Sequence, residues 1–157
     1  MMAEIVLGID PGAKGALAWV TKGGHLLEVA DMPTVEVRGK LRVSAQGVAA
    51  LLFKRDVSLI VIEGVGSMPG QGVASSFAFG YAAGILEGVA SGAGVPVQII
   101  QAAVWKRKAG VPADKGAARQ MAARFWPGAV DQFKRVKDDG RAESCLLARW
   151  LATDKGC

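Results

Sequence analysis

Acidic residues close two apolar segments of this chain, in positions where they could hold a metal ion. Asp10 ends a stretch that begins with the apolar run 5–7, and Glu63 ends the nearly continuous apolar run 57–62. Both runs are typical of buried strands. A carboxylate at the end of a buried strand is poorly solvated and needs a partner such as a divalent cation. Asp10 alone could equally begin a turn, because Asp-Pro-Gly is common turn chemistry.

Further acids lie in residues 138–143, Asp-Asp-Gly-Arg-Ala-Glu. Asp139 and Glu143 are four residues apart and share one face of a predicted helix. Apolar residues continue along that helix, so it must lie on the sheet, with its acidic first turn near the strand ends. Asp138 is expected to point elsewhere or to cap the helix. The helix dipole explains acids at this N-terminus but not those at the two strand ends.

Carboxylates that are brought together repel one another unless a cation lies between them. Oxygen ligands alone suit hard cations, Mg²⁺ or Mn²⁺. Two such ions about 4 Å apart can activate a water and stabilise the leaving oxygen of a phosphodiester. The acidic set therefore predicts metal-dependent phosphodiester hydrolysis.

The elements that position these acids follow an α/β pattern. Short connections predict an antiparallel meander of three strands, and two later apolar runs are typical of parallel strands. Helices alternate with those later strands, so we expect a mixed five-stranded sheet flanked by helices. At 157 residues the simplest organisation is a single domain, 1–157. The predicted strands are 4–10, 15–21, 26–30, 57–62 and 95–100, and the predicted helices begin at Ser44 and cover 74–91, 102–108, 114–126 and 138 onward. A polar loop is expected over 33–42, and a glycine-rich segment over 64–72.

The charge balance favours a polyanionic partner. Nineteen basic residues face fourteen acidic ones, for a net charge of +5. One histidine, His25, and two cysteines without metal-type spacing, Cys145 and Cys157, leave little for a zinc site or a Ser-His-Asp triad. We expect both thiols to be reduced, no signal peptide and no membrane-spanning helix, and therefore a cytoplasmic protein.

Three motifs together, Gly-Ile-Asp-Pro-Gly, Val-Ile-Glu and Asp-Gly-Arg-Ala-Glu-Ser-Cys-Leu-Leu-Ala, resemble those of the RuvC family of Holliday-junction resolvases. The likeness is greatest to phage and other divergent members within the RNase H-like superfamily, and it spans nearly the whole chain. It implies an RNase H-like fold and a homodimer that cuts four-way DNA junctions by symmetric, metal-dependent hydrolysis with two Mg²⁺ ions. Mn²⁺ should substitute, and no organic cofactor is expected. The four metal ligands carry over to Asp10, Glu63, Asp139 and Glu143.

The family often has Asp at the last of these positions, three residues after the previous acid. Here the residue is Glu143 and the spacing is four, so Asp138 stays open as an alternative to Asp139. The resemblance also places Lys106 and Lys115 beside the site, where they would neutralise phosphate near the cut. Lys115 is expected to be the nearer of the two to the chemistry. Arg107 and Arg119 in the same basic segment are predicted DNA contacts.

Bacterial members of the family carry an aromatic wedge shortly after the strand-end Glu, and this chain lacks it. Met68 could insert between bases instead, or Phe77 or Phe79 could stack on them. We expect at least one of these phenylalanines to belong to the core. Small residues four apart on the same helix indicate either a helix–helix or dimer contact or tight packing against the chain's own sheet. They are Gly80, Gly84 and Gly88.

Three other functions remain to be separated from junction resolution. Gly-Ile-Asp-Pro-Gly also resembles the first phosphate loop of actin-like ATPases and sugar kinases, which need a second domain for which 157 residues leave no room. A related nuclease could cut flaps, forks or RNA–DNA hybrids. A basic protein could also bind junctions without cutting them, and metal-dependent cleavage distinguishes that protein from the enzyme.

Overall fold

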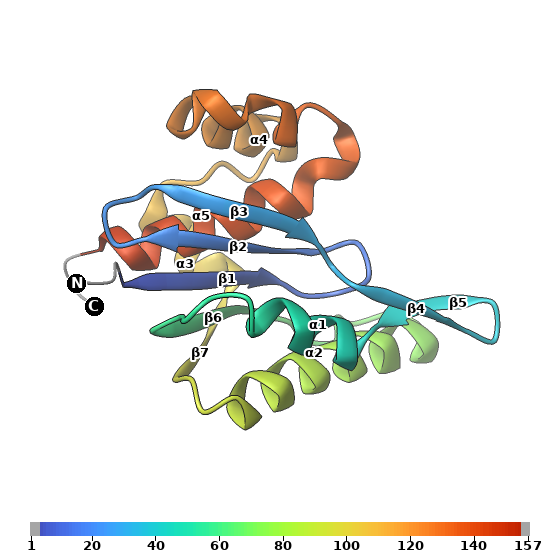
Figure 1. Cartoon of the computed structure of the whole chain (residues 1–157). Coiled ribbons are helices and arrows are strands. Elements are labelled where there is room, and N and C mark those ends of the chain that lie inside the picture. Colours follow the sequence, from blue (N-terminus) through green and yellow to red (C-terminus); the bar gives the residue numbers. More distant parts are fainter. Residues whose placement is uncertain (1–3, 155–157) are drawn as a thin grey trace.

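A mixed five-stranded sheet lies at the centre of the computed structural model, which describes residues 4–154 (Figure 1). The strands are β1 (Ile5–Asp10), β2 (Ala16–Thr21), β3 (Leu26–Asp31), β6 (Leu59–Gly64) and β7 (Val97–Gln101), in the order β3-β2-β1-β6-β7. The first three pair antiparallel, whereas β6 and β7 continue the sheet in parallel with β1. The predicted α/β class and mixed sheet are confirmed.

Helices cover both faces of this sheet (Figure 1). One face packs against α5 (Asp139–Thr153) and α3 (Ala102–Ala109), and α4 (Lys115–Phe125) packs in turn against α5. The other face packs against α1 (Ala45–Leu52) and α2 (Val73–Gly92). Each face has its own apolar core, because successive residues of a strand point to opposite sides.

This alternation decides where the strand-end acids point. Val6 of β1 lies in the core beneath α5, whereas Leu7 and Ile9 lie in the core beneath α1 and α2. Asp10 follows the parity of Val6 and therefore points toward the α5 face. In β6 the apolar neighbours alternate in the same way, so Glu63 points to that face too.

Two helices begin where the sequence predicts them. The Ser44 hydroxyl accepts a hydrogen bond from the Gly47 N–H at 3.1 Å at the start of α1. The Asp114 carboxylate accepts one from the Ala117 N–H at 2.7 Å at the start of α4. Both side chains satisfy N–H groups that have no partner inside the helix.

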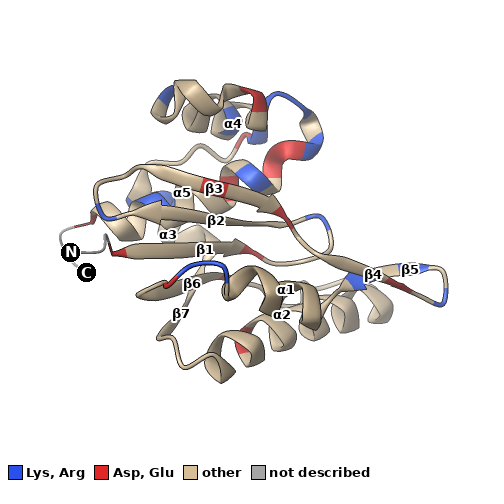
Figure 2. Cartoon of the chain, viewed as in Figure 1, with Lys and Arg blue, Asp and Glu red and all other residues tan. Residues whose placement is uncertain are grey.

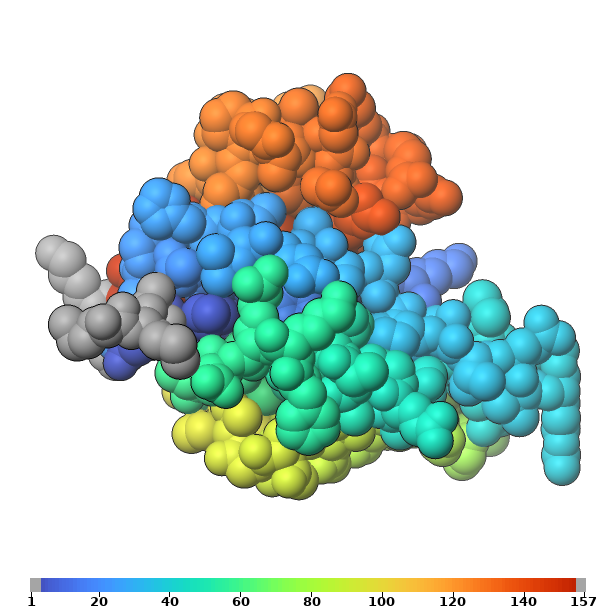
Figure 3. All heavy atoms as spheres, in the orientation of Figure 1, coloured from blue at the N-terminus to red at the C-terminus, as the bar shows by residue number. Residues whose placement is uncertain are grey.

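The predicted loop over residues 33–42 is wrong. The chain forms a hairpin there, of β4 (Thr34–Val37) and β5 (Lys40–Val43), which projects from the body of the molecule (Figure 3). Its two-residue turn has positive φ at Arg38 (51°) and Gly39 (76°), as a tight hairpin turn requires. Arginine rarely adopts such a φ, so the turn gave little signal in the sequence. The stretch between α4 and α5 also forms two short 3₁₀ helices, η1 (Pro127–Phe133) and η2 (Val136–Asp138).

Helix α2 buries little of its surface. Phe77 is 59% exposed and Phe79 is 42% exposed, so the expectation that one of them belongs to the core is wrong. A Cβ on Gly80, Gly84 or Gly88 would meet nothing within 4 Å, so these glycines do not pack against the chain's own sheet. Figure 2 shows α2 almost without charge. By length and composition alone this 20-residue helix could cross a membrane, a test that core helices of soluble proteins also pass.

Cys145 is a buried free thiol, as predicted. Burial raises its pKa, which keeps it protonated and unreactive. Cys157 lies outside the residues that the structure describes.

Candidate metal centre

Three carboxylates predicted as metal ligands meet at one end of the sheet. Asp10, Glu63 and Glu143 each offer a carboxylate oxygen, and the three oxygens lie within 4.8 Å of one another. Glu63 and Glu143 are buried, and Asp10 is half-buried. Such a group could hold a metal ion through hard oxygen ligands.

The strand register explains why two of these acids meet. Ile9 of β1 pairs with Ile62 of β6 in the parallel ladder. The next residue of each strand is Asp10 or Glu63, so both acids leave the sheet at the same level and on the same face.

Two glycines let α5 bring the third acid to this point. A Cβ on Gly8 would lie 2.4 Å from the Ser144 carbonyl oxygen, so only glycine lets α5 cross β1 this closely. A Cβ on Gly140 would lie 2.7 Å from the Lys14 carbonyl oxygen and 3.1 Å from Oδ2 of Asp10. The first turn of α5 therefore rests on the loop after β1, with Glu143 one turn further along the helix.

The electrostatics of the site favour a bound cation. Burial raises the pKa of Asp10 well above its usual range, and the charges of Glu143 and Glu63 raise it further. Burial, followed by the charge of Glu143, raises the pKa of Glu63 to about 6. Oε2 of Glu63 is buried and has no hydrogen-bond partner among residues 4–154. A buried acceptor without a donor is costly, and a metal ion would satisfy it.

Lys106 supplies a positive charge to this acidic group. Its Nζ donates a hydrogen bond to Oε1 of Glu143 at 2.9 Å and lies 3.9 Å from Oε1 of Glu63. Burial lowers the pKa of Lys106, but the hydrogen bond to Glu143 and the negative charges of Glu143, Glu63 and Asp10 together outweigh burial, so the pKa is raised overall. The residue lies on α3, which follows β7 directly, and this position places its ammonium beside the acids.

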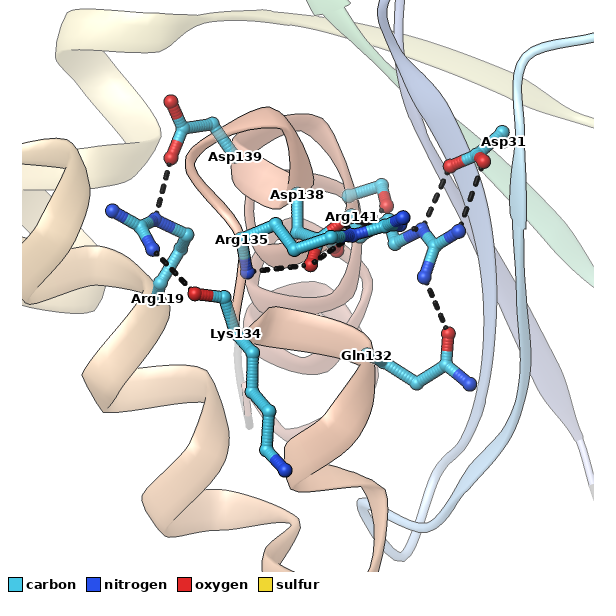
Figure 4. A network of polar contacts seen from close by, with 9 residues as sticks. Asp31, Arg119, Gln132, Lys134, Arg135, Asp138, Asp139 and Arg141 are labelled. Atoms are coloured by element: carbon cyan, nitrogen blue, oxygen red, sulfur yellow. Dashed lines mark hydrogen bonds and ion pairs between the residues drawn. The ribbon is translucent and has the colours of Figure 1, made fainter.

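Asp139 does not join the three carboxylates and points toward Arg119 instead (Figure 4). Its Oδ1 forms an ion pair at 2.8 Å with Nε of Arg119, which comes from α4. The same guanidinium donates from Nη1 to the Lys134 carbonyl oxygen at 3.3 Å. A predicted metal ligand and a predicted DNA contact are thus paired with each other.

Asp138 has a structural role that the sequence did not reveal. It is 1% exposed and accepts hydrogen bonds from the backbone and the guanidinium of Arg135 at 2.8 to 3.2 Å (Figure 4). Burial raises the pKa of Asp138, but the bonds from Arg135 lower it below its usual range overall. Arg141, 3.9 Å away, binds Asp31 at the end of β3 through two hydrogen bonds of 2.7 and 2.9 Å.

The remaining predicted contacts surround the site less closely. Lys115 is the exposed first residue of α4, and its charge lowers the pKa of Asp10 against the larger effects that raise it. Arg107 is exposed on α3. Met68 is 71% exposed in the glycine-rich segment, where its N–H donates to Oε1 of Gln71 at 2.9 Å.

Solved structures share this arrangement of elements. RuvC from Thermus thermophilus in complex with Holliday junction substrate gives a TM-score of 0.64 at 19% identity, over 94% of this chain and 91% of that one. A second RuvC structure from the same organism gives 0.63 at 21% identity, over 93% and 92%. This chain has the RuvC fold. The yeast mitochondrial Holliday junction resolvase Ydc2 shares it with a TM-score of 0.54 at 13% identity, over 96% and 80%. The RNase H-like fold expected from the sequence is confirmed, although no family model and no curated protein sequence matches the chain.

Proposed function

We propose that residues 1–157 form a single endonuclease domain that resolves four-way DNA junctions by metal-dependent hydrolysis. The observation that carries the proposal is the group Asp10, Glu63 and Glu143 at the carboxyl ends of β1 and β6 in a RuvC fold, in which Oε2 of Glu63 has no hydrogen-bond partner among the described residues. These oxygens fit Mg²⁺, with Mn²⁺ as a substitute. A purely junction-binding protein would have no use for three mutually repelling carboxylates.

Within this proposal the acids have distinct tasks. Asp10, Glu63 and Glu143 would hold the metal, and Asp139 is the proposed fourth ligand once its ion pair with Arg119 opens. Two bound ions would supply an activated water and stabilise the leaving oxygen. The ammonium of Lys106 would hold the Glu143 carboxylate in position through its hydrogen bond, and Lys115 would offer a positive charge to the phosphate being cut. No organic cofactor is needed for this chemistry.

Paired nicks require two active sites related by symmetry, so we propose a homodimer. Its support is the outward-facing row Gly80, Gly84 and Gly88 on the nearly uncharged helix α2, which would let a second copy approach closely. Met68 would reach the centre of the junction, and Arg107 and Arg119 would contact the backbone. The expected location is the cytoplasm of a bacterium or of a phage-infected host.

The decisive experiment compares cleavage of a four-way junction, a flap, a fork, an RNA–DNA hybrid and a linear duplex, in Mg²⁺ and in Mn²⁺. Junction cutting with symmetric nicks on opposite strands is expected. Preferred cutting of another substrate would leave a nuclease but refute the resolvase. Junction binding with no nick in either metal would leave only a binding protein.

The variant Asp10→Asn should lose cleavage and retain junction binding, because the basic residues that contact phosphate are unchanged. Asp56→Asn is the matched control, since Asp56 is exposed and precedes β6 at the opposite end of the sheet. Loss of junction binding by a folded Asp10→Asn protein would count against the assignment.

A further inference from the structure

The β4–β5 hairpin carries a basic strip that the metal centre does not use. Val37 pairs with Lys40, and Val35 pairs with Arg42. Residues directly opposite in an antiparallel pair share a face, so Lys40 and Arg42 lie on the same side. Glu36, the only acid of the hairpin, pairs with Leu41 on the other side. Arg38 in the turn adds a third positive charge; Arg38 and Lys40 are exposed, whereas Arg42 is half-buried.

The hairpin leaves the sheet at the same end as the metal centre. Asp10 pairs with Ala16 in one ladder, and Ala16 pairs with Asp31 in the next. β4 starts three residues after Asp31, and the Ser44 N–H closes the base of the hairpin on the Pro33 carbonyl oxygen at 2.9 Å. Figure 1 shows the hairpin reaching outward from this end of the sheet, and Figure 3 shows its tip projecting beyond the body of the molecule.

The hairpin is also braced. The Arg42 guanidinium lies 5.7 Å from the ring centre of Phe77 and 5.3 Å from that of Tyr81, and these two rings stack at 6.1 Å. A cation over aromatic faces is held by the ring quadrupoles and keeps its charge. Both rings belong to α2, which follows the segment after Glu63. These contacts hold the hairpin against α2, the helix that follows β6 and its strand-end acid Glu63 in the chain.

We infer that the β4–β5 hairpin binds the phosphate backbone of a duplex arm of the DNA substrate. The inference rests on the proposed function. Lys40 and Arg42 are two residues apart on a strand, or about 7 Å, so they can reach different phosphates of one DNA strand. Lysine and arginine without a neighbouring acid on the same face complement a polyanion. The apolar residues of the hairpin would lie against the sugars.

The test is salt-dependent junction binding without divalent metal. The double variant Arg38→Ala/Lys40→Ala should bind at least about tenfold more weakly at 0.1 M salt, and the slope of log K against log salt should fall by about 2. The matched control, Lys22→Ala/Lys54→Ala, removes the same charge. Lys22 forms an ion pair with Glu4, and Lys54 forms one with Glu28. Both lysines lie at the end of the sheet opposite the metal centre, because Lys22 follows β2 and Lys54 precedes β6. The control should bind like the wild type.

An unchanged slope in the hairpin variant would overturn the inference, while junction cleavage by the wild type would still support the proposed function. A variant that loses cleavage but binds with the wild-type slope would overturn it as well. Sedimentation separates a third possibility, in which the hairpin contacts a second copy of the chain. A shift from dimer to monomer in the variant would assign the hairpin to a subunit interface and refute DNA contact.

Discussion

Replacing a carboxylate of the candidate metal centre should stabilise this protein when metal is absent. In Glu63→Gln the buried charge disappears while the shape of the side chain is nearly kept. Burial and the charge of Glu143 raise the pKa of Glu63 from 4.5 to about 6. That difference corresponds to about 2 kcal/mol, by which the ionised form destabilises the fold.

The sign of the pH dependence follows from the direction of this shift. The folded protein binds the proton more tightly than the unfolded chain, so the penalty is absent below about pH 4.5 and complete above about pH 6. We expect Glu63→Gln to exceed the wild type by about 2 kcal/mol at pH 8 in EDTA and to lose this advantage as the pH falls toward 4.5. Lys106 loses a partner at 3.9 Å, but it keeps its bond to Glu143, so the offset is small.

Thermal unfolding measures this difference directly. For a chain of this size 2 kcal/mol corresponds to an increase of about 4–8 °C in Tm. Glu87→Gln on the exposed side of α2 is the control and should leave Tm unchanged. In Mg²⁺ the wild type should gain stability by ligand linkage, whereas Glu63→Gln should gain less because it has lost a ligand. A variant that melts at or below the wild-type temperature at pH 8 in EDTA would refute the reasoning.

Three further substitutions test the contacts around the site. Lys106→Met removes an ammonium that competes with a cation for the carboxylates, so calorimetry should find tighter Mn²⁺ binding, and weaker binding would contradict this role. Arg119→Gln releases Asp139, and Mn²⁺ affinity should rise about two- to fivefold, an increase that a purely structural ion pair would not produce. Gly8→Ala should lower the free energy of unfolding by about 3 kcal/mol or more, because the new Cβ would overlap α5. Gly92→Ala, with open space around it, should be neutral or stabilising in the same denaturant titration.

The sequence predicted the acidic residues of the site better than the contacts around them, because the acids are marked by signals between residues that are close together in the sequence. Nearly continuous apolar runs end at Asp10 and Glu63, and each run can be recognised in the sequence without any tertiary contact. The spacing of Glu143 within an amphipathic helix is local too. Asp10 and Glu63 then come together because β1 and β6 are parallel neighbours whose register places the two strand ends at the same level.

The parts that could not be predicted depend on contacts between distant residues. Nothing near Asp139 in the sequence indicates that Arg119, twenty positions earlier, forms an ion pair with it. The β4–β5 hairpin was mistaken for a loop because its turn uses an arginine with positive φ and because its exposed faces mix polar and apolar residues. Exposure of Phe77 and Phe79 likewise depends on how α2 sits on the sheet, which aromatic content does not reveal.

The choice between Asp138 and Asp139 illustrates how a structural role removes a candidate ligand. Asp138 is buried and has its oxygens bonded to Arg135, so binding a metal would cost those bonds and leave the guanidinium without its partner. Asp139 would have to break one ion pair with Arg119, which is partly exposed and has a second acceptor on Lys134. Asp139 would therefore lose fewer interactions than Asp138 on binding a metal, which supports Asp139 as the fourth ligand. Asp138 and Arg141 connect the start of α5 to Arg135 and to Asp31 of β3. These contacts fix the position of α5 along the sheet, and with it the position of Glu143 relative to Asp10 and Glu63.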